Sequence, residues 1–244
     1  MPKKVVLIIQ ARMSSSRLPA KSMLDLAGEP LIYRLLERVK RCQLVDEIVL
    51  AIPKNSEDDL LFEEAKRSNV KCYRGSENDL LDRYYQAAKE NNADIVGRIP
   101  ADNPLSEPNE IDRIIAHHKS LNQPGFSSNL AEVFGNGYPD GIGAEMVDFE
   151  ILEKTWLSET DQHKREHVHL NFYDYNSRVE ANNEICPVTT IECPKEYKRP
   201  DLILDVNTEA EYQFIKKIYE HFYHDNSSFG IRDIIQWYEK IYVK

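Results

Sequence analysis

The feature that most constrains the fold of this chain is a regular alternation of short apolar runs with segments of helical periodicity. Residues 5–11 are almost continuously apolar and rich in β-branched residues, which is typical of a strand buried on both faces of a parallel sheet. Apolar residues then recur at helical spacing over about 29–42, where Pro30 suits a first helical turn. These two segments form one strand–helix unit.

The alternation continues as far as residue 99. Three further strands are predicted at 47–52, 70–73 and 95–99, and the two helices between them at 56–68 and 79–91. Alternating strands and helices joined by short turns favour a mostly parallel sheet flanked by helices, whose ligands bind at the carboxyl ends of the strands. The predicted fold class is therefore α/β, with the binding residues just after strands.

Beyond about Pro124 glycines punctuate short segments, which predicts loops and antiparallel strands. We expect the stretch at about 125–176 to be a small irregular insert. Its aromatic residues suit an interface or a small core, and they include Phe126, Phe134, Trp156, Phe172 and Tyr173.

Regular structure is predicted again as a strand at 202–204 and helices at about 208–222 and 231–242. No repeat or linker divides the chain, so residues 1–244 are predicted to form one domain.

Charge and cysteine content restrict the partners and the compartment. The formal net charge of -10 opposes attraction to nucleic acid or to anionic membranes, so we expect neither as a partner. No apolar stretch is long enough to span a bilayer or to form a signal segment. The cysteines form no C-x-x-C pair, which favours reduced thiols in a cytoplasmic protein; they are Cys42, Cys72, Cys186 and Cys193.

Cations and hydroxyl groups cluster in residues 11–21, directly after the first strand. Arg12, Arg17 and Lys21 supply the charge, and three consecutive serines begin at Ser14. A triphosphate needs this combination of positive charge and hydrogen-bond donors. The loop lacks the spacing of a P-loop and of G-x-G-x-x-G, so neither an ATPase nor a dinucleotide-binding protein is indicated. On charge alone, a solvated basic turn explains the loop equally well.

The loop also resembles the signature of an enzyme family. A-R-x-S-S-S-R-L-P-x-K after an apolar strand is similar to the cytidylyltransferases that activate 3-deoxy-manno-octulosonate and acylneuraminates, and especially to their spore-coat polysaccharide biosynthesis relatives. Further blocks similar to that family follow in the same order at 74–84, 136–141, 165–168 and 204–205. The resemblance implies a nucleotide-diphospho-sugar transferase-like fold, Mg²⁺ as cofactor, CTP and a small acceptor as substrates, and a homodimer.

The resemblance also implies which residues bind the nucleotide. That set comprises Gln10, Ala11, Arg12, Ser14, Arg17, Lys21, Arg74 and Arg98.

Two aspartates fall just after predicted strands. Asp102 follows the strand at 95–99, and Asp205 follows the strand at 202–204. Carboxylates from different strands of one sheet edge can share Mg²⁺, which favours hard oxygen ligands and triphosphate oxygens. The resemblance makes Asp102 the family's metal-binding aspartate, so we expect Asp102, Asp205 and Lys21 to be catalytic. The alternative for either aspartate is a turn or helix-cap role.

A third group suits the acceptor, and we therefore expect the insert at about 125–176 to serve acceptor binding or dimerisation. It comprises Tyr138, Asp140 and Glu145 in the glycine-rich stretch, followed by Arg165 and His167. Acceptors of the resembling enzymes are acidic sugars, and an arginine with a histidine can bind a carboxylate or phosphate by charge-assisted hydrogen bonds. Residues 162–169 read equally well as the polar face of a helix.

The predicted reaction is attack by an acceptor oxygen on the α-phosphorus of CTP, in line with departing pyrophosphate. Catalysis rests on positioning and charge neutralisation. One alternative is a nucleotide-sugar-dependent glycosyltransferase, which predicts a D-x-D motif where this chain has Asp102-Asn103-Pro104. Another is a non-catalytic nucleotide-binding protein of a surface-polysaccharide pathway, although both aspartates and all three loop cations are present.

Overall fold

The computed structural model describes residues 2–15, 17–181 and 186–242, and these contain a seven-stranded sheet of order β11-β7-β8-β6-β1-β4-β5. Its strands are β1 (Val5–Gln10), β4 (Glu47–Pro53), β5 (Lys71–Gly75), β6 (Ile95–Pro100), β7 (Phe126–Ser128), β8 (Glu145–Asp148) and β11 (Val188–Thr189). Strand β8 is antiparallel to its neighbours β6 and β7, and the other neighbouring strands pair in parallel. The prediction of an α/β fold with a mostly parallel sheet is confirmed.

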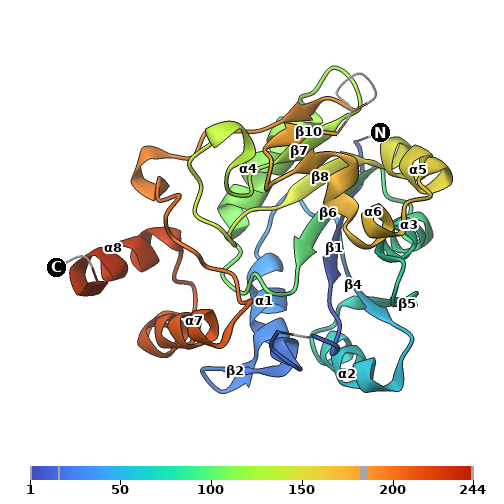
Figure 1. Cartoon of the computed structure of the whole chain (residues 1–244). Coiled ribbons are helices and arrows are strands. Elements are labelled where there is room, and N and C mark those ends of the chain that lie inside the picture. The colour runs from blue at the N-terminus through green and yellow to red at the C-terminus, as the bar shows by residue number, and fades with distance from the viewer. Residues whose placement is uncertain (1, 16, 182–185, 243–244) are drawn as a thin grey trace.

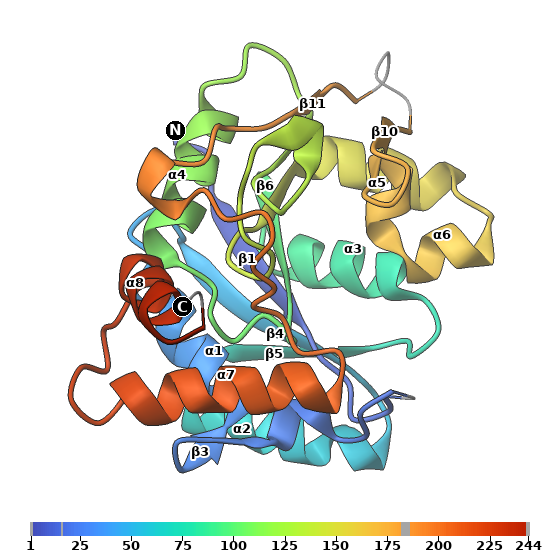
Figure 2. The ribbon, with the colours of Figure 1, turned by 60° about the vertical axis from the view of Figure 1, so that its left-hand side comes forward.

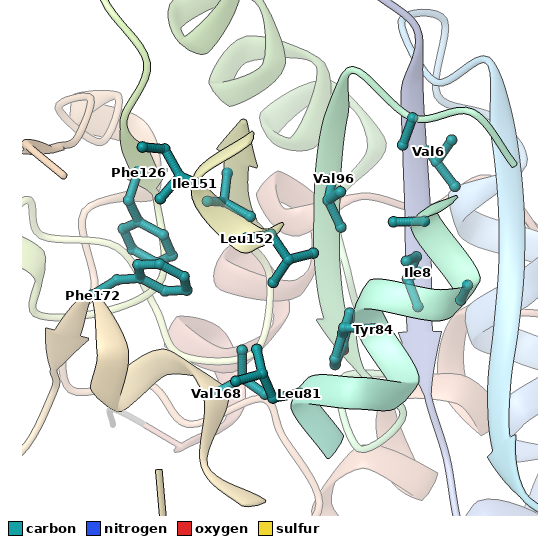
Figure 3. Packing of buried hydrophobic residues seen from close by; sticks show 14 of the residues in the cluster. Val6, Ile8, Leu81, Tyr84, Val96, Phe126, Ile151, Leu152, Val168 and Phe172 are labelled. Atoms are coloured by element: carbon teal, nitrogen blue, oxygen red, sulfur yellow. The ribbon is translucent and has the colours of Figure 1, made fainter. Parts of the chain in front are cut away.

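Helices cover both faces of the sheet (Figure 1). They are α1 (Leu31–Val39), α2 (Asp59–Arg67), α3 (Leu80–Glu90), α4 (Pro108–Lys119) and α5 (Phe149–Ser158). Side chains of β1 alternate between the faces. Val6 and Ile8 belong to the core under α3 and α5. Val5, Leu7 and Ile9 pack on the other face with α1, α2 and α4. Figure 3 shows the first of these cores, where Tyr84 of α3 lies beside Ile8. The fully apolar β1 is thus explained by burial on both sides.

The elements predicted up to residue 99 are present, with ends displaced by a few residues. Helix α1 ends at Val39, before the predicted end at 42, and helix α2 begins at Asp59, after the short 3₁₀-helix η2 (Ser56–Asp58). Helix α4 was not predicted. Its signal was available in Pro108 at the first helical turn and in Ile111 and Ile115 at helical spacing, all of which are buried.

The segment 125–176 is more regular than predicted. Strands β7 and β8 enter the central sheet, and β9 (Tyr173–Asp174) forms a separate antiparallel pair with β10 (Val179–Glu180), which follows the segment. The antiparallel strands were predicted, but helix α5 was not. Helix α6 (Gln162–Glu166) agrees with the alternative reading of residues 162–169 as the polar face of a helix. Helix α5 forms because Ile151 and Leu152 pack in the same core as α3.

The C-terminal part forms a third apolar cluster. Helix α7 (Glu209–Phe222) lies beside α1 in both views (Figures 1 and 2), and it packs on α8 (Ile231–Tyr242) through Phe214 and Trp237. Helix α7 begins with the predicted capping box of Thr208 and Glu211. No helix in the described part of the chain is long and apolar enough to cross a membrane. Short elements complete the chain: η1 (Lys21–Met23), β2 (Asp25–Leu26), β3 (Glu29–Pro30), η3 (Val133–Gly135), η4 (Val168–Asn171) and η5 (Lys195–Tyr197).

The predicted strand at 202–204 is wrong. Leu202 and Leu204 are buried and Ile203 is exposed, which is the alternation of a strand. The segment instead makes a single parallel bridge, between Ile203 and Asp140, outside the central sheet. Its apolar side chains pack against α7 and α8 and not against the sheet.

Candidate active site

A cavity of about 420 Å³ opens at the carboxyl ends of β1 and β6, the sheet edge predicted for ligands. Many of the predicted site residues line it: Gln10, Ala11, Arg12, Ser14, Arg17, Lys21, Arg98, Asp102, Asp140, His167 and Asp205. Four others are not among the lining residues: Arg74, Tyr138, Glu145 and Arg165.

The basic loop is held against the acidic residues by direct contacts. Lys21 Nζ donates to Asp102 Oδ2 at 2.6 Å and to the carbonyl oxygen of Val206 at 3.0 Å. Arg17 Nη2 donates to Asn207 Oδ1 at 3.0 Å. The loop after β1 and the segment before α7 therefore border the same cavity.

Backbone hydrogen bonds of the residues on either side of Asp205 hold it at this cavity. The Val206 N–H donates to the carbonyl oxygen of Asp102 at 2.8 Å, and the Leu204 N–H donates to that of Asp140 at 3.1 Å. Gly141 packs on this segment with φ +84°, and a Cβ there would lie 2.6 Å from the carbonyl carbon of Leu204. Only glycine permits this approach, so Asp205 depends on a glycine distant in sequence for its position.

Three carboxylates of the cavity repel one another. Burial, followed by the negative charges of Asp140 and Asp102, raises the pKa of Asp205 to about 7. Burial raises the pKa of Asp140 as well, and the charge of Asp102 adds to the effect. Bringing like charges together in a partly buried site is unfavourable without a cation.

The donor chemistry of this acidic group fits Mg²⁺ bound together with phosphates. In the described ranges no three His, Cys, Asp or Glu side chains are arranged to hold a metal ion by themselves. Mg²⁺ is usually held by one or two carboxylates plus substrate phosphates and water, not by an all-protein cage. Asp102 and Asp205 are the pair that would hold it.

Arg98 is supported by a buried hydrogen-bond network beneath the cavity. Its Nη1 donates to Glu145 Oε2 at 2.6 Å, and its Nε donates to Gln10 Oε1 at 3.2 Å. Tyr84 donates to the same Gln10 oxygen, and Tyr175 donates to the other oxygen of Glu145. Burial opposes the charge of Arg98, but Glu145 outweighs it and raises the pKa of the guanidinium. Glu145 thus contacts Arg98 and does not line the cavity.

The remaining predicted residues form contacts within the fold. Arg74 pairs with Asp59 at 2.6 Å. Arg165 Nε donates to Asp79 Oδ2 at 2.8 Å, and its Nη1 donates to the carbonyl oxygens of Trp156 and Glu159. The hydroxyl of the buried Tyr138 donates to Glu110. The bonds from Arg165 to Asp79, Trp156 and Glu159 hold its guanidinium away from the cavity wall.

Other residues line the cavity but were not assigned a role from the sequence. They include Ser22, Glu77, Leu80, Arg83, Asn103, Leu130, His169 and Asn207. Burial lowers the pKa of His169 to about 4. Glu77, Leu80 and Arg83 fall in the block at 74–84 that resembles the cytidylyltransferases, which was the available signal.

Comparison with a solved structure gives the class of the protein. A cytidylyltransferase from Leptospira borgpetersenii serovar Hardjo-bovis matches with a TM-score of 0.85 at 29% identity, over 98% of this chain and 94% of that one. Together with the site at the carboxyl ends of the strands, this match defines a nucleotidyltransferase.

The family follows from the sequence. The cytidylyltransferase family model matches residues 6–229, and the chain belongs to that family. An uncharacterised protein of Methanocaldococcus jannaschii is 31% identical over 237 residues, which cover 97% of this chain and 91% of the relative. The spore coat polysaccharide biosynthesis protein SpsF of Bacillus subtilis is 26% identical over 221 residues, which cover 88% and 86%. The predicted family and enzyme class are confirmed.

Proposed function

We propose that this enzyme transfers CMP from CTP to a small acidic sugar or phosphorylated acceptor, releases pyrophosphate, and serves surface-glycan biosynthesis. The observation that carries the proposal is the cavity in which the cations of the basic loop meet Asp102 and Asp205. Cations suit the triphosphate, and the carboxylate pair suits its metal. The name of the SpsF relative supports a polysaccharide pathway.

Arg12, Arg17 and Lys21 hold the triphosphate in this proposal. Mg²⁺ on Asp102 and Asp205 would neutralise phosphate charge and stabilise the transition state. The acceptor oxygen forms a bond to the α-phosphorus while the bond from that phosphorus to pyrophosphate breaks, and the acceptor's proton passes to solvent. The three cations hold the departing pyrophosphate, so the chain's main contribution is alignment and charge compensation.

We assign direct contact with the acceptor to those residues of the acceptor group that line the cavity. His167 and Asp140 can contact an acceptor directly. Glu145 acts through Arg98, which it contacts at 2.6 Å. We assign Tyr138 and Arg165 to the acceptor side of the cavity. They act there as positioning residues, because their polar atoms bond to other parts of the fold.

Homodimerisation is part of the proposal. Phe134 and Leu157 in the segment 125–176 are 53% and 70% exposed, which suits an interface. Phe126, Phe172 and Tyr173, which were also expected there, are buried within the protomer. Light scattering at micromolar concentration should give the mass of a dimer, and a monomer would count against the assembly. The cytoplasmic location stays a prediction.

Nucleotide preference tests the proposal with the isolated protein. A ligand that binds only the folded state raises the melting temperature. In Mg²⁺, CTP should raise it more than UTP, ATP or GTP at equal concentration. A larger shift with UTP or ATP would overturn the cytidylyl assignment and leave nucleotidyl transfer standing.

A further inference from the structure

The loop that carries Asp102 is held by side chains from distant parts of the chain. It joins β6 to α4 through residues 101–107, which the structure describes as turns outside any helix or strand. Much of the loop is nevertheless buried, including Asn103, Leu105, Ser106 and Glu107. Buried carbonyl groups outside helices and strands need other hydrogen-bond partners. Two of those partners come from side chains of α1 and α7.

Tyr219 of α7 holds the middle of the loop. Its hydroxyl donates to the carbonyl oxygen of Pro104 at 2.6 Å, and the residue is 1% exposed. Its ring packs edge-on against Phe229, with 5.4 Å between the ring centroids. Because packing fixes the ring and a hydrogen bond has a direction, the position of the Pro104 carbonyl group follows that of α7.

Arg38 of α1 holds the end of the loop. Its Nε donates to the carbonyl oxygen of Ser106 at 2.8 Å, and its Nη2 donates to Glu107 Oε2 at 3.3 Å. Its Nη1 donates to the carbonyl oxygen of Phe229 at 3.0 Å, and Glu107 Oε2 also accepts from the Ile231 N–H at 2.9 Å. A buried ion pair often stabilises a fold no more than apolar packing would. What this network adds is rigidity, because each of its bonds restrains the direction of a group in the loop.

Helix α7 is attached to the segments of both aspartates. It begins at Glu209, shortly after Asp205, and the Val206 N–H donates to the carbonyl oxygen of Asp102 at 2.8 Å. Further along the same helix, Tyr219 contacts the loop at a second point. Two points of attachment restrain both the separation and the mutual orientation of the two carboxylates, which one point alone does not.

We infer that Tyr219 is a positioning residue for the metal site: its bond to the loop fixes Asp102 relative to Asp205. The network of Arg38 holds the other end of the same loop. The inference rests on the proposed function, in which the two aspartates bind Mg²⁺. Tyr219 is not among the residues that line the cavity, so it acts through the loop and not by contact with a substrate. Partners that orient metal ligands commonly change metal affinity or activity by about tenfold or more.

Tyr219→Phe tests the inference, because it removes one hydroxyl and keeps the ring. The matched control is Tyr212→Phe on the same helix. Tyr212 is also buried, and its hydroxyl donates to the carbonyl oxygen of Asp25 at 2.9 Å, outside the segments of both aspartates. Each variant loses one hydrogen bond to a backbone carbonyl group, so both should melt lower than the wild type by a similar few degrees.

Two measurements on the full chain separate the variants. In calorimetric titrations with CTP, Mg²⁺ should raise the affinity of the wild type above that in EDTA. Tyr219→Phe should lose part of this gain and keep the affinity in EDTA, whereas Tyr212→Phe should keep both. Turnover is measured as CMP transfer to the acceptor that the wild type uses best in a panel of acidic sugars. The kcat should fall about tenfold in Tyr219→Phe at an unchanged acceptor KM, and it should stay at the wild-type value in Tyr212→Phe.

If Tyr219→Phe does not fold, Glu107→Gln carries the test. It keeps an oxygen acceptor for the Ile231 N–H, removes the charge that pairs with Arg38, and should show the same two losses. An equal kcat and an equal Mg²⁺-dependent gain in the folded variant and in Tyr212→Phe, with an active wild type, overturn the inference and leave the proposed function intact. A wild type that transfers no CMP, or whose CTP affinity does not respond to Mg²⁺, overturns the proposed function itself.

Discussion

The ammonium nitrogen of Lys21 lies 2.6 Å from Asp102 Oδ2 and joins the loop after β1 to the end of β6. The same nitrogen donates to the carbonyl oxygen of Val206, the residue after Asp205. The Lys21 side chain is 16% exposed, which a solvated basic turn does not explain. The basic loop and the two aspartates are therefore parts of one charge-matched site.

The two aspartates should control turnover more than nucleotide affinity. Asp102→Asn or Asp205→Asn removes a charged hard ligand, so kcat should fall by orders of magnitude while CTP binding weakens modestly. Asp201→Asn is the matched control, because Asp201 is exposed and pairs with Arg199. Near-normal kcat in Asp205→Asn would mean that Asp205 has only a local structural role before α7.

Two neighbouring residues of the acceptor group should behave differently. His167 is exposed and lines the cavity, so His167→Ala should raise the acceptor KM without changing the melting temperature. Arg165 bonds to Asp79 and to two carbonyl oxygens, so Arg165→Ala should lower the melting temperature by several degrees. If Arg165→Ala instead raises the acceptor KM at an unchanged melting temperature, Arg165 contacts the acceptor directly.

A methyl group at Gly141 should disturb the site as well as the backbone. In Gly141→Ala the new Cβ would lie 2.7 Å from the Asp205 amide nitrogen, so both stability and kcat should fall. Gly28 has a similar φ of +86°, but a Cβ added there would meet no atom within 4 Å. Gly28→Ala should therefore lower the free energy of unfolding only by the backbone strain, about 1–2 kcal/mol, and leave kcat unchanged. Equal kcat values for the two variants would contradict the role of Gly141 in placing Asp205.

Asp148 should make stability depend on pH in the acid range. Burial opposes its ionisation, but contacts with His118, Lys3 and the Gly125 N–H outweigh it and lower its pKa from 3.8 to about 2. A carboxylate with a lowered folded-state pKa stabilises the fold above its unfolded pKa, and this stabilisation is lost as the pH falls from about 4 to about 2. Asp148→Asn should therefore lower the free energy of unfolding by about 2 kcal/mol at pH 7.

Denaturant titration at several pH values measures this contribution. The difference between wild type and Asp148→Asn should shrink as the pH falls below about 4, because the wild-type carboxylate then becomes protonated. A difference that is the same at about pH 7 and about pH 2 would assign the effect to packing and not to charge.

The sequence was sufficient to predict the location of those candidate site residues whose position follows from the parallel sheet. Arg12 and Asp102 follow β1 and β6, and parallel strands bring their carboxyl ends to one edge. Asp205 lines the same cavity as Asp102, but the argument that predicted this was wrong, since the segment before Asp205 is not a strand of the sheet. Its position depends on the bond from the Val206 N–H to Asp102 and on the contact with Gly141, which no local pattern reveals.

Side-chain pairing was harder to predict than strand order. Glu145 lies opposite Arg98 because β8 is antiparallel to β6, and that register is a long-range property. Arg83 sits at a buried position of α3, where helical periodicity would place an apolar residue. That its Nε and Nη1 atoms have no hydrogen-bond partner among the described residues follows from the arrangement of neighbouring segments, which no local pattern reveals.

Transfer of the α-phosphorus is the most direct test of the central claim. The enzyme is incubated with Mg²⁺, nucleoside triphosphates labelled at the α-phosphorus, and a panel of acidic sugars and phosphorylated small molecules. The account predicts that the label of CTP moves to an acceptor and that the amount of pyrophosphate released equals the amount of label transferred. It also predicts that Asp102→Asn abolishes the transfer. Transfer of the label from UTP or ATP in preference to CTP would contradict it.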